Sequence, residues 1–134
     1  MIEIYFAQLE TQFQDFPLIS SYSLSKKIYN AKQGFIKGKI VFEDGSQLNF
    51  TEVKNTDKPD KIKYSYHYMN QEQHLVFRYD NAPHHHELST FPHHKHLPSK
   101  VEPHKELTLR DVLLEIAQDK NLNRLKNVLG IEQK

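Results

Sequence analysis

The stretch KIKYSYHYMNQEQHLVFRYD (residues 61–80) contains two segments with the periodicity of β-strands. In KIKYSYHYM (61–69), apolar or aromatic residues alternate with lysine, serine and histidine. Successive side chains of a strand point to opposite faces of a sheet, so one face of this segment is predicted to be core. We expect that face to carry Ile62, Tyr64, Tyr66 and Tyr68. In HLVFRYD (74–80), the alternation separates Leu75, Phe77 and Tyr79 from Val76, Arg78 and Asp80.

The N-terminal half predicts one helix and three further strands. Apolar residues at helical spacing precede Pro17, and they are Ile2, Tyr5, Phe6, Leu9 and Phe13. Alternating apolar residues then mark strands near 22–28, 36–42 and 48–50. The Asp-Gly of EDGS (43–46) favours a tight hairpin between the last two.

The C-terminal part predicts one or two helices. Thr108 is placed to cap a helix, with Asp111 three residues on. A second short helix is expected after QDKN, over LNRLKNVLG (122–130), ending at Gly130. We therefore predict the α+β class, with a single antiparallel sheet of about five strands, an N-terminal helix and one or two C-terminal helices. The size suits one domain over residues 1–134.

Composition narrows the classes of function. Lysine and arginine total 18 against 17 aspartates and glutamates, a net charge of +1, so nucleic-acid binding would need a local basic patch. The chain has no cysteine, which excludes disulfides and thiolate metal sites. No apolar run approaches the ~20 residues of a membrane span, and the first residues do not resemble a signal peptide. We expect a cytoplasmic protein without membrane contacts.

Histidines are concentrated directly after the second of the two strands quoted above. NAPHHHELSTFPHHKH (81–96) holds six of the nine histidines in two blocks, each beginning Pro-His-His. Prolines at 83, 92, 98 and 103 predict loops and short extended pieces rather than a long helix. Three interpretations are open: solvated surface histidines, a metal site, or a set of acid–base groups.

A metal site would use histidines two residues apart, which can face the same way on an extended segment. The candidate ligands are His84, His86, His94 and His96, with Asp80 or Glu87 completing the site. Neutral imidazole is a common ligand for zinc and similar ions. Zinc or magnesium is therefore one alternative; otherwise no cofactor is expected.

Acid–base chemistry is the interpretation that we favour. RNA cleavage without a metal needs a base for the 2′-hydroxyl, an acid for the leaving 5′-oxygen and cations around the phosphorus. Imidazole can serve as base or acid near neutral pH. The candidate catalytic residues are Arg78, Asp80, His84, His85, His93, His94, Lys95 and His96. This hypothesis requires both histidine blocks to fold back and meet beside Arg78.

A second constellation lies in LNFTEVK (48–54), where Glu52 and Lys54 share a strand face with Leu48 and Phe50. Glu-x-Lys on a strand, preceded by an acidic residue such as Asp44, is the arrangement of metal-dependent nucleases, in which carboxylates hold magnesium. An exposed ion pair would explain the same two residues, and the hairpin turn explains the aspartate.

The segments FRYDNAPHH (77–85) and TFPHHKH (90–96) resemble the signature of the TumE family, the toxin halves of small prokaryotic toxin–antitoxin pairs. FEDGSQLNFTEVK (42–54) and LRDVLLEIA (109–117) are also similar to that family. The resemblance spans residues 1–118, which leaves 119–134 as a C-terminal helical extension. It implies a small toxin that a cognate antitoxin protein neutralises by direct contact. It assigns no catalytic roles.

Together, the residues and the resemblance predict a toxin that acts on RNA as an endoribonuclease through its histidine-rich loop. One alternative is a metal-dependent nuclease that uses Glu52 and Lys54 or histidine ligands. The other is a non-catalytic module that binds a macromolecule, in which the histidines shape the surface that meets a partner.

Overall fold

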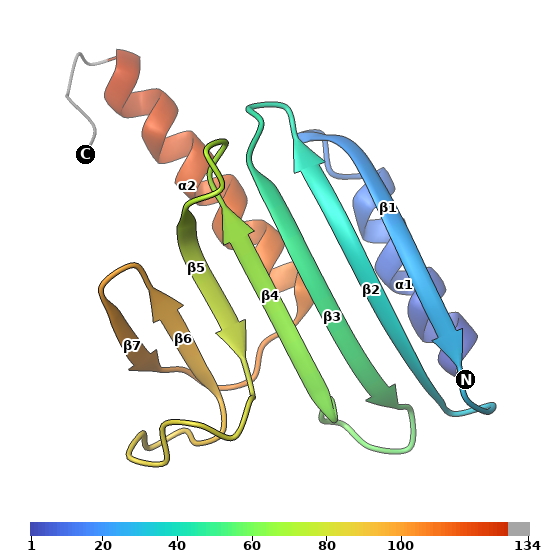
Figure 1. The fold of residues 1–134 in the computed structure, drawn as a ribbon. Helices are drawn as coiled ribbons and strands as arrows, with labels where there is room; N and C mark the ends of the chain where they lie inside the picture. The colour runs from blue at the N-terminus through green and yellow to red at the C-terminus, as the bar shows by residue number, and fades with distance from the viewer. Residues whose placement is uncertain (129–134) are drawn as a thin grey trace.

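The computed structural model describes the backbone of residues 1–128 and the side chains of residues 1–121. The elements are α1 (Ile2–Gln14), β1 (Ile19–Ile28), β2 (Gln33–Phe42), β3 (Gln47–Asn55), β4 (Lys63–Met69), β5 (Leu75–Asp80), β6 (His94–Leu97), β7 (Lys100–Pro103) and α2 (Leu109–Val128). The strands form one antiparallel sheet in sequential order. Both helices lie on the same face of that sheet (Figure 1). The predicted class and single antiparallel sheet are confirmed, with seven strands instead of about five.

The hydrophobic core lies between the helices and the sheet. Alternation in the central strands places every second side chain against the helices, which is why β3 and β4 alternate between buried and partly exposed residues. The buried side chains from the helices are Ile2, Phe6, Leu9, Phe13, Leu109, Val112, Leu113 and Ile116. The tyrosine stripe Tyr64, Tyr66 and Tyr68 is buried, as predicted.

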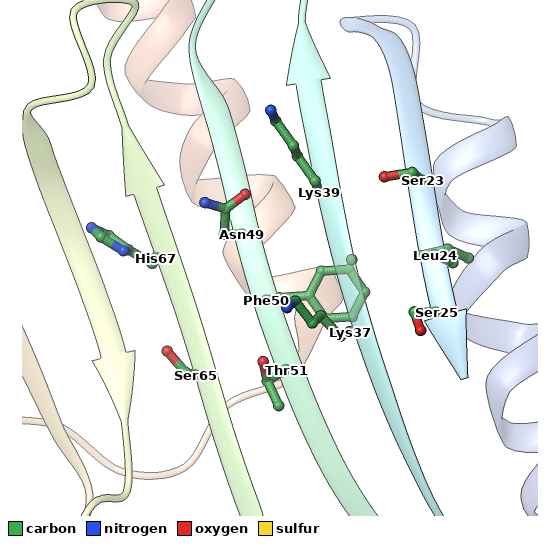
Figure 2. Close-up of a pocket in the computed structure, with 11 residues that line it drawn as sticks. Ser23, Leu24, Ser25, Lys37, Lys39, Asn49, Phe50, Thr51, Ser65 and His67 are labelled. Carbon is green, nitrogen blue, oxygen red and sulfur yellow. The ribbon is translucent and has the colours of Figure 1, made fainter. Parts of the chain in front are cut away.

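In the part of the chain that the structure describes, no helix covers the other face of the sheet, and polar side chains cross that face in two rows. The strand register defines row one as Ser25, Lys37, Thr51, Ser65, Asp80 and His94. Row two is Ser23, Lys39, Asn49, His67, Arg78 and His96. Figure 2 shows the part of these rows on β1 to β4, with the side chains on the uncovered face. Both rows end among the predicted site residues.

Strands β6 and β7 are the short extended pieces predicted for the proline-rich segment, and because they join the sheet it has seven strands instead of about five. Two other details of the prediction were wrong. Ile62 is 57% exposed and Lys61 is 8% exposed, because β4 begins after both residues and its alternation does not reach them. Finally, α2 runs without a break through QDKN to Val128. The predicted end at Gly130 lies outside the described residues.

The start of α2 has the predicted cap. The backbone N–H of Asp111 donates to Thr108 Oγ1 at 3.1 Å, and the backbone N–H of Thr108 donates to Asp111 Oδ2 at 3.0 Å. Over the described part of the chain, neither helix has the length and apolar character that crossing a membrane requires.

Candidate active site on the uncovered face of the sheet

The pairing of β5 with β6 assembles the candidate active site. Its register sets Asp80 opposite His94 and Arg78 opposite His96, with all four residues on the uncovered face. Asp80 is the centre of the group: its carboxylate lies 2.9 Å from Arg78 Nε, 2.9 Å from His94 Nε2 and 3.4 Å from His96 Nε2. The backbone N–H of Ala82 also donates to Asp80 Oδ1 at 3.0 Å. The carboxylate thus fixes the positions of Arg78 and His94, and Arg78 in turn holds His96.

His94 is oriented from both sides of its ring and is shielded from solvent. Its Nδ1 donates to the carbonyl of Pro92 at 2.8 Å, and Nε2 faces Asp80 Oδ1. Both partner atoms are acceptors, so a proton must also lie between Nε2 and the carboxylate. The side chain is only 1% exposed. Because neither nitrogen is free to meet a substrate, we assign His94 a positioning role.

His96 is the histidine of β6 that can act as a base. The Arg78 guanidinium donates to its Nε2 at 3.1 Å, so this nitrogen accepts and carries no proton. Burial and then the positive charge of Arg78 lower the pKa of His96 below its ordinary value. The same two causes lower the pKa of His67, which lies opposite Arg78 on β4. Both imidazoles are therefore neutral at pH 7.

The first histidine block contributes His85 to the same group. Its backbone has φ 61°, in the left-handed region, where non-glycine residues are uncommon and cost about 1–3 kcal/mol. In this conformation its ring lies 5.2 Å from that of His94 and 5.7 Å from that of His96. One nitrogen from each of these three histidines falls within 4.8 Å of the others. The two histidine blocks therefore meet beside Arg78.

An open groove of about 450 Å³ gives access to this group. It is lined by Arg78, Asp80, His94 and His96, by His84 from the loop, and by His67 and Ser65 from β4. The sequence had not predicted His67 as a site residue. His67 is on the uncovered face because side chains alternate along β4, and the pairing of β4 with β5 sets it opposite Arg78.

Three other predicted residues point elsewhere. Lys95 lies on the helix side of β6, where its Nζ is 3.0 Å from Glu115 and 4.9 Å from the centre of the Tyr79 ring. His93 accepts or donates a hydrogen bond at 2.9 Å with the hydroxyl of Tyr64. The structure therefore separates Lys95 and His93 from the group around Asp80. His86, a predicted metal ligand, instead stacks on Phe91 with a ring separation of 4.3 Å.

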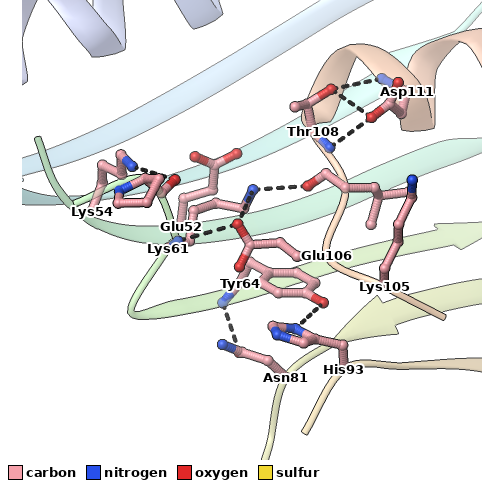
Figure 3. Close-up of polar contacts among 12 residues, drawn as sticks. Glu52, Lys54, Lys61, Tyr64, Asn81, His93, Lys105, Glu106, Thr108 and Asp111 are labelled. Atoms are coloured by element: carbon pink, nitrogen blue, oxygen red, sulfur yellow. Dashed lines mark hydrogen bonds and ion pairs between the residues drawn. The ribbon is translucent and has the colours of Figure 1, made fainter. Parts of the chain in front are cut away.

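The Glu52 and Lys54 pair is also on the helix side, in the interior (Figure 3). Glu52 is 1% exposed and accepts hydrogen bonds from the hydroxyls of Tyr5 and, at 2.6 Å, Tyr66. Burial and then the Glu52 charge raise the pKa of both tyrosines, so they remain protonated donors. Lys54 Nζ donates to two backbone carbonyls, at 2.6 and 3.0 Å. These contacts occupy the groups that a magnesium site would need.

Asp44, the third member of the predicted nuclease constellation, lies in the turn between β2 and β3. Its carboxylate accepts a hydrogen bond from the backbone N–H of Ser46 at 2.9 Å and pairs with Lys120 of α2. It therefore stabilises the turn and its contact with the helix.

Comparison with known proteins identifies a family. Residues 9–120 match the family described as Toxin TumE. Searches of curated proteins and of solved structures found no match. The matched segment runs from α1 to α2 and includes all seven strands and every residue of the candidate active site. The chain therefore belongs to the TumE family of toxins, which implies a cognate antitoxin as its partner.

Proposed function

We propose that this toxin is an endoribonuclease that cleaves RNA without a metal ion, at the group formed by Arg78, Asp80, His85, His94 and His96. The observation that carries the proposal is the meeting of the neutral, partly exposed His96 with Arg78 in one open groove, together with the partly exposed His85, whose ring lies 5.7 Å from that of His96. These are the groups that transesterification of RNA requires.

The chemistry follows from the positions of the nitrogens. His96 Nε2 takes the proton from a 2′-hydroxyl, and the 2′-oxygen forms a bond to the adjacent phosphorus. The bond from phosphorus to the 5′-oxygen breaks, and His85 gives a proton to that oxygen. Arg78 transfers its hydrogen bond from His96 to the phosphate and stabilises the added negative charge. The products are a 2′,3′-cyclic phosphate and a 5′-hydroxyl end.

His85 suits the acid role because it is less enclosed than His94. Its side chain is 34% exposed, and Glu87 lies 3.5 Å from its Nδ1 and forms an ion pair when the ring is protonated. His84 is the other exposed imidazole at the groove and reaches the same space from the loop. Asp80 and His94, which are both buried, hold Arg78 in position through the Asp80 carboxylate.

A histidine-bound metal is the second candidate, favoured by the three nitrogens of His85, His94 and His96. Tetrahedral zinc has bonds of about 2.1 Å, which sets its ligands roughly 3.4 Å apart. The histidine nitrogens lie up to 4.8 Å apart and would have to move inward. The adjacent Arg78 also opposes a second positive charge. Acid–base catalysis therefore fits the geometry better.

The test is cleavage of RNA by the purified protein in the presence of a chelator. We expect His96→Ala and His85→Ala each to reduce the rate at least 100-fold, the usual scale of general acid–base catalysis. His74→Ala is the matched control, because His74 lies in the turn before β5 with its side chain 72% exposed. Full loss of activity on chelation would instead support the metal. Equal activity in all three variants would overturn the proposal.

A further inference from the structure

The uncovered face of the sheet is strongly basic although the whole chain carries a net charge of only +1. From the register, the described strand residues on this face include Lys27, Lys37, Lys39, Lys63 and Arg78 and a single carboxylate, Asp80. Many acidic side chains lie on the other side, where the helices pack; they include Glu10, Glu52, Glu102 and Glu115. Folding thus creates the local basic patch that the composition alone does not predict.

This face is also hollowed continuously from β1 to β6. A second groove, of about 520 Å³, lies over β1 to β4 (Figure 2). It shares Thr51, Ser65 and His67 with the groove of the active site. From β2, which carries Lys37 and Lys39, to β6 is four strand spacings of about 4.8 Å, or roughly 19 Å. At about 3.4 Å per stacked nucleotide, that distance corresponds to roughly five to six nucleotides.

The side chains along this path suit a single strand. Exposed lysines at one end can contact phosphates, while Asn49, Thr51 and Ser65 in the middle offer hydrogen-bonding groups to bases and riboses. Asn49 Oδ1 is buried and, within the described part of the chain, has no hydrogen-bond partner. An N–H from a base would satisfy it. A duplex would present phosphates to these short side chains and keep its base edges out of reach.

We propose, building on the endoribonuclease function above, that single-stranded RNA binds across this face. Lys37 and Lys39 hold phosphates on one side of the scissile bond, and the polar rows lead the chain to Arg78 and His96. The two rows contain no aromatic ring other than imidazole, and the Phe50 ring that lines the groove is only 2% exposed and cannot stack on a base. Binding is therefore mainly electrostatic and depends strongly on salt.

The experiment measures binding separately from cleavage. The ligand is a fluorescent RNA of roughly ten nucleotides, in the size range of single-strand binding sites, with 2′-O-methyl riboses that lack the nucleophile. Its Kd is measured by anisotropy from low to high salt for the full chain and for Lys37→Ala/Lys39→Ala. The matched control is Lys26→Ala/Arg110→Ala, which removes the same charge on the helix side, where Lys26 pairs with Glu10 and Arg110 of α2 lines a pocket between the two helices.

The logarithm of the association constant falls linearly with the logarithm of the salt concentration, and each lost phosphate contact makes this slope shallower by about 0.7 for a single strand. We expect Lys37→Ala/Lys39→Ala to lower that slope by about 1.4, which is roughly a 25-fold loss of affinity at 0.1 M salt. The control pair should keep the slope of the unmodified chain. Equal slopes in both variants would overturn the proposal. The proposal would also be overturned if Lys37→Ala/Lys39→Ala bound RNA as well as the unmodified chain but no longer bound the cognate antitoxin. This face would then be the antitoxin interface.

The two proposals can fail independently. Lysine-dependent binding of the methylated RNA without cleavage of ordinary RNA would refute the endoribonuclease function and leave the binding face intact. Cleavage that requires His96, with RNA binding that does not depend on Lys37 and Lys39, would refute the binding face alone.

Discussion

Replacing Asp80 by alanine tests how the candidate site is held together. The carboxylate is 9% exposed and contacts Arg78, His94 and His96 as well as the backbone N–H of Ala82. Its removal leaves the buried His94 ring without a partner for Nε2. A buried polar atom without a hydrogen-bond partner costs free energy, because no water replaces the lost bond.

The magnitude can be estimated contact by contact. The hydrogen bond between His94 and the carboxylate contributes about 1.5–3 kcal/mol, because one or both partners are charged and the pair is buried. The hydrogen bond from the Ala82 backbone contributes about 1 kcal/mol. Arg78 is 39% exposed, so solvent screens its ion pair and the loss is below about 1 kcal/mol. We therefore expect Asp80→Ala to lower the free energy of unfolding by about 3 kcal/mol, or the Tm by roughly 12 °C.

Urea unfolding followed by circular dichroism measures this loss. The control is Asp57→Ala, which removes a carboxylate paired with Lys32 at the surface, where both side chains are more than half exposed. That variant should lose no more than about 0.5 kcal/mol. An Asp80→Ala protein as stable as Asp57→Ala would show that the carboxylate does not anchor the site and would refute the reasoning.

Three further predictions concern the sheet and its core. Because the pKa values of His67 and His96 are lowered in the folded state, the stability that they contribute is fully present above pH 6.5 and is lost as the pH falls through the folded pKa. Urea unfolding at pH 7.5 and at pH 5 measures how much stability is lost on acidification. That loss should be smaller in the variant with both histidines replaced by glutamine than in the unmodified chain, and an equal loss in the two proteins would contradict this. Gly38→Ala would place its Cβ 2.2 Å from the ring of Phe50, so we expect a loss of about 1–3 kcal/mol in urea unfolding; Phe50→Leu in the same chain should restore part of it, and no loss would argue against this packing. Glu52→Gln replaces one of the two carboxylate oxygens that accept tyrosine hydrogen bonds by an NH2 group, which cannot accept. We expect the free energy of unfolding to fall by about 1–2 kcal/mol while RNA cleavage stays unchanged; a stable variant that no longer cleaves would restore Glu52 as a catalytic candidate.

Much of the fold could be predicted because its signals are local. Tyr66 and Phe77 are core residues in strands whose alternation is visible in the sequence, and the helix cap at Thr108 is a short motif. Strands β6 and β7 could not be recognised in the same way. Each has only four residues, and each is defined by hydrogen bonds to a neighbouring strand rather than by a periodic pattern of its own.

The sequence named most residues of the candidate site, but it could indicate only part of their arrangement in space. That Arg78 and the second histidine block lie together follows from two strands pairing, but the register that sets His96 opposite Arg78 depends on the loop between them. The left-handed backbone at His85 has only a weak sequence signal, since glycine is the residue that usually adopts it. Lys95 was misplaced for a simpler reason. The alternation that was applied to His94 and His96 places the residue between them on the opposite face, and the catalytic hypothesis did not apply it to Lys95.

The central claim is that the histidines around Arg78 cleave RNA by acid–base chemistry. Its most direct test is to identify the ends of the products when the full chain is incubated with single-stranded RNA in a chelator. We predict 2′,3′-cyclic phosphate and 5′-hydroxyl ends, formed by the unmodified chain and by His74→Ala but not by His96→Ala. Intact RNA with the unmodified chain, or 3′-hydroxyl and 5′-phosphate ends that form only when a divalent metal is added, would contradict the claim.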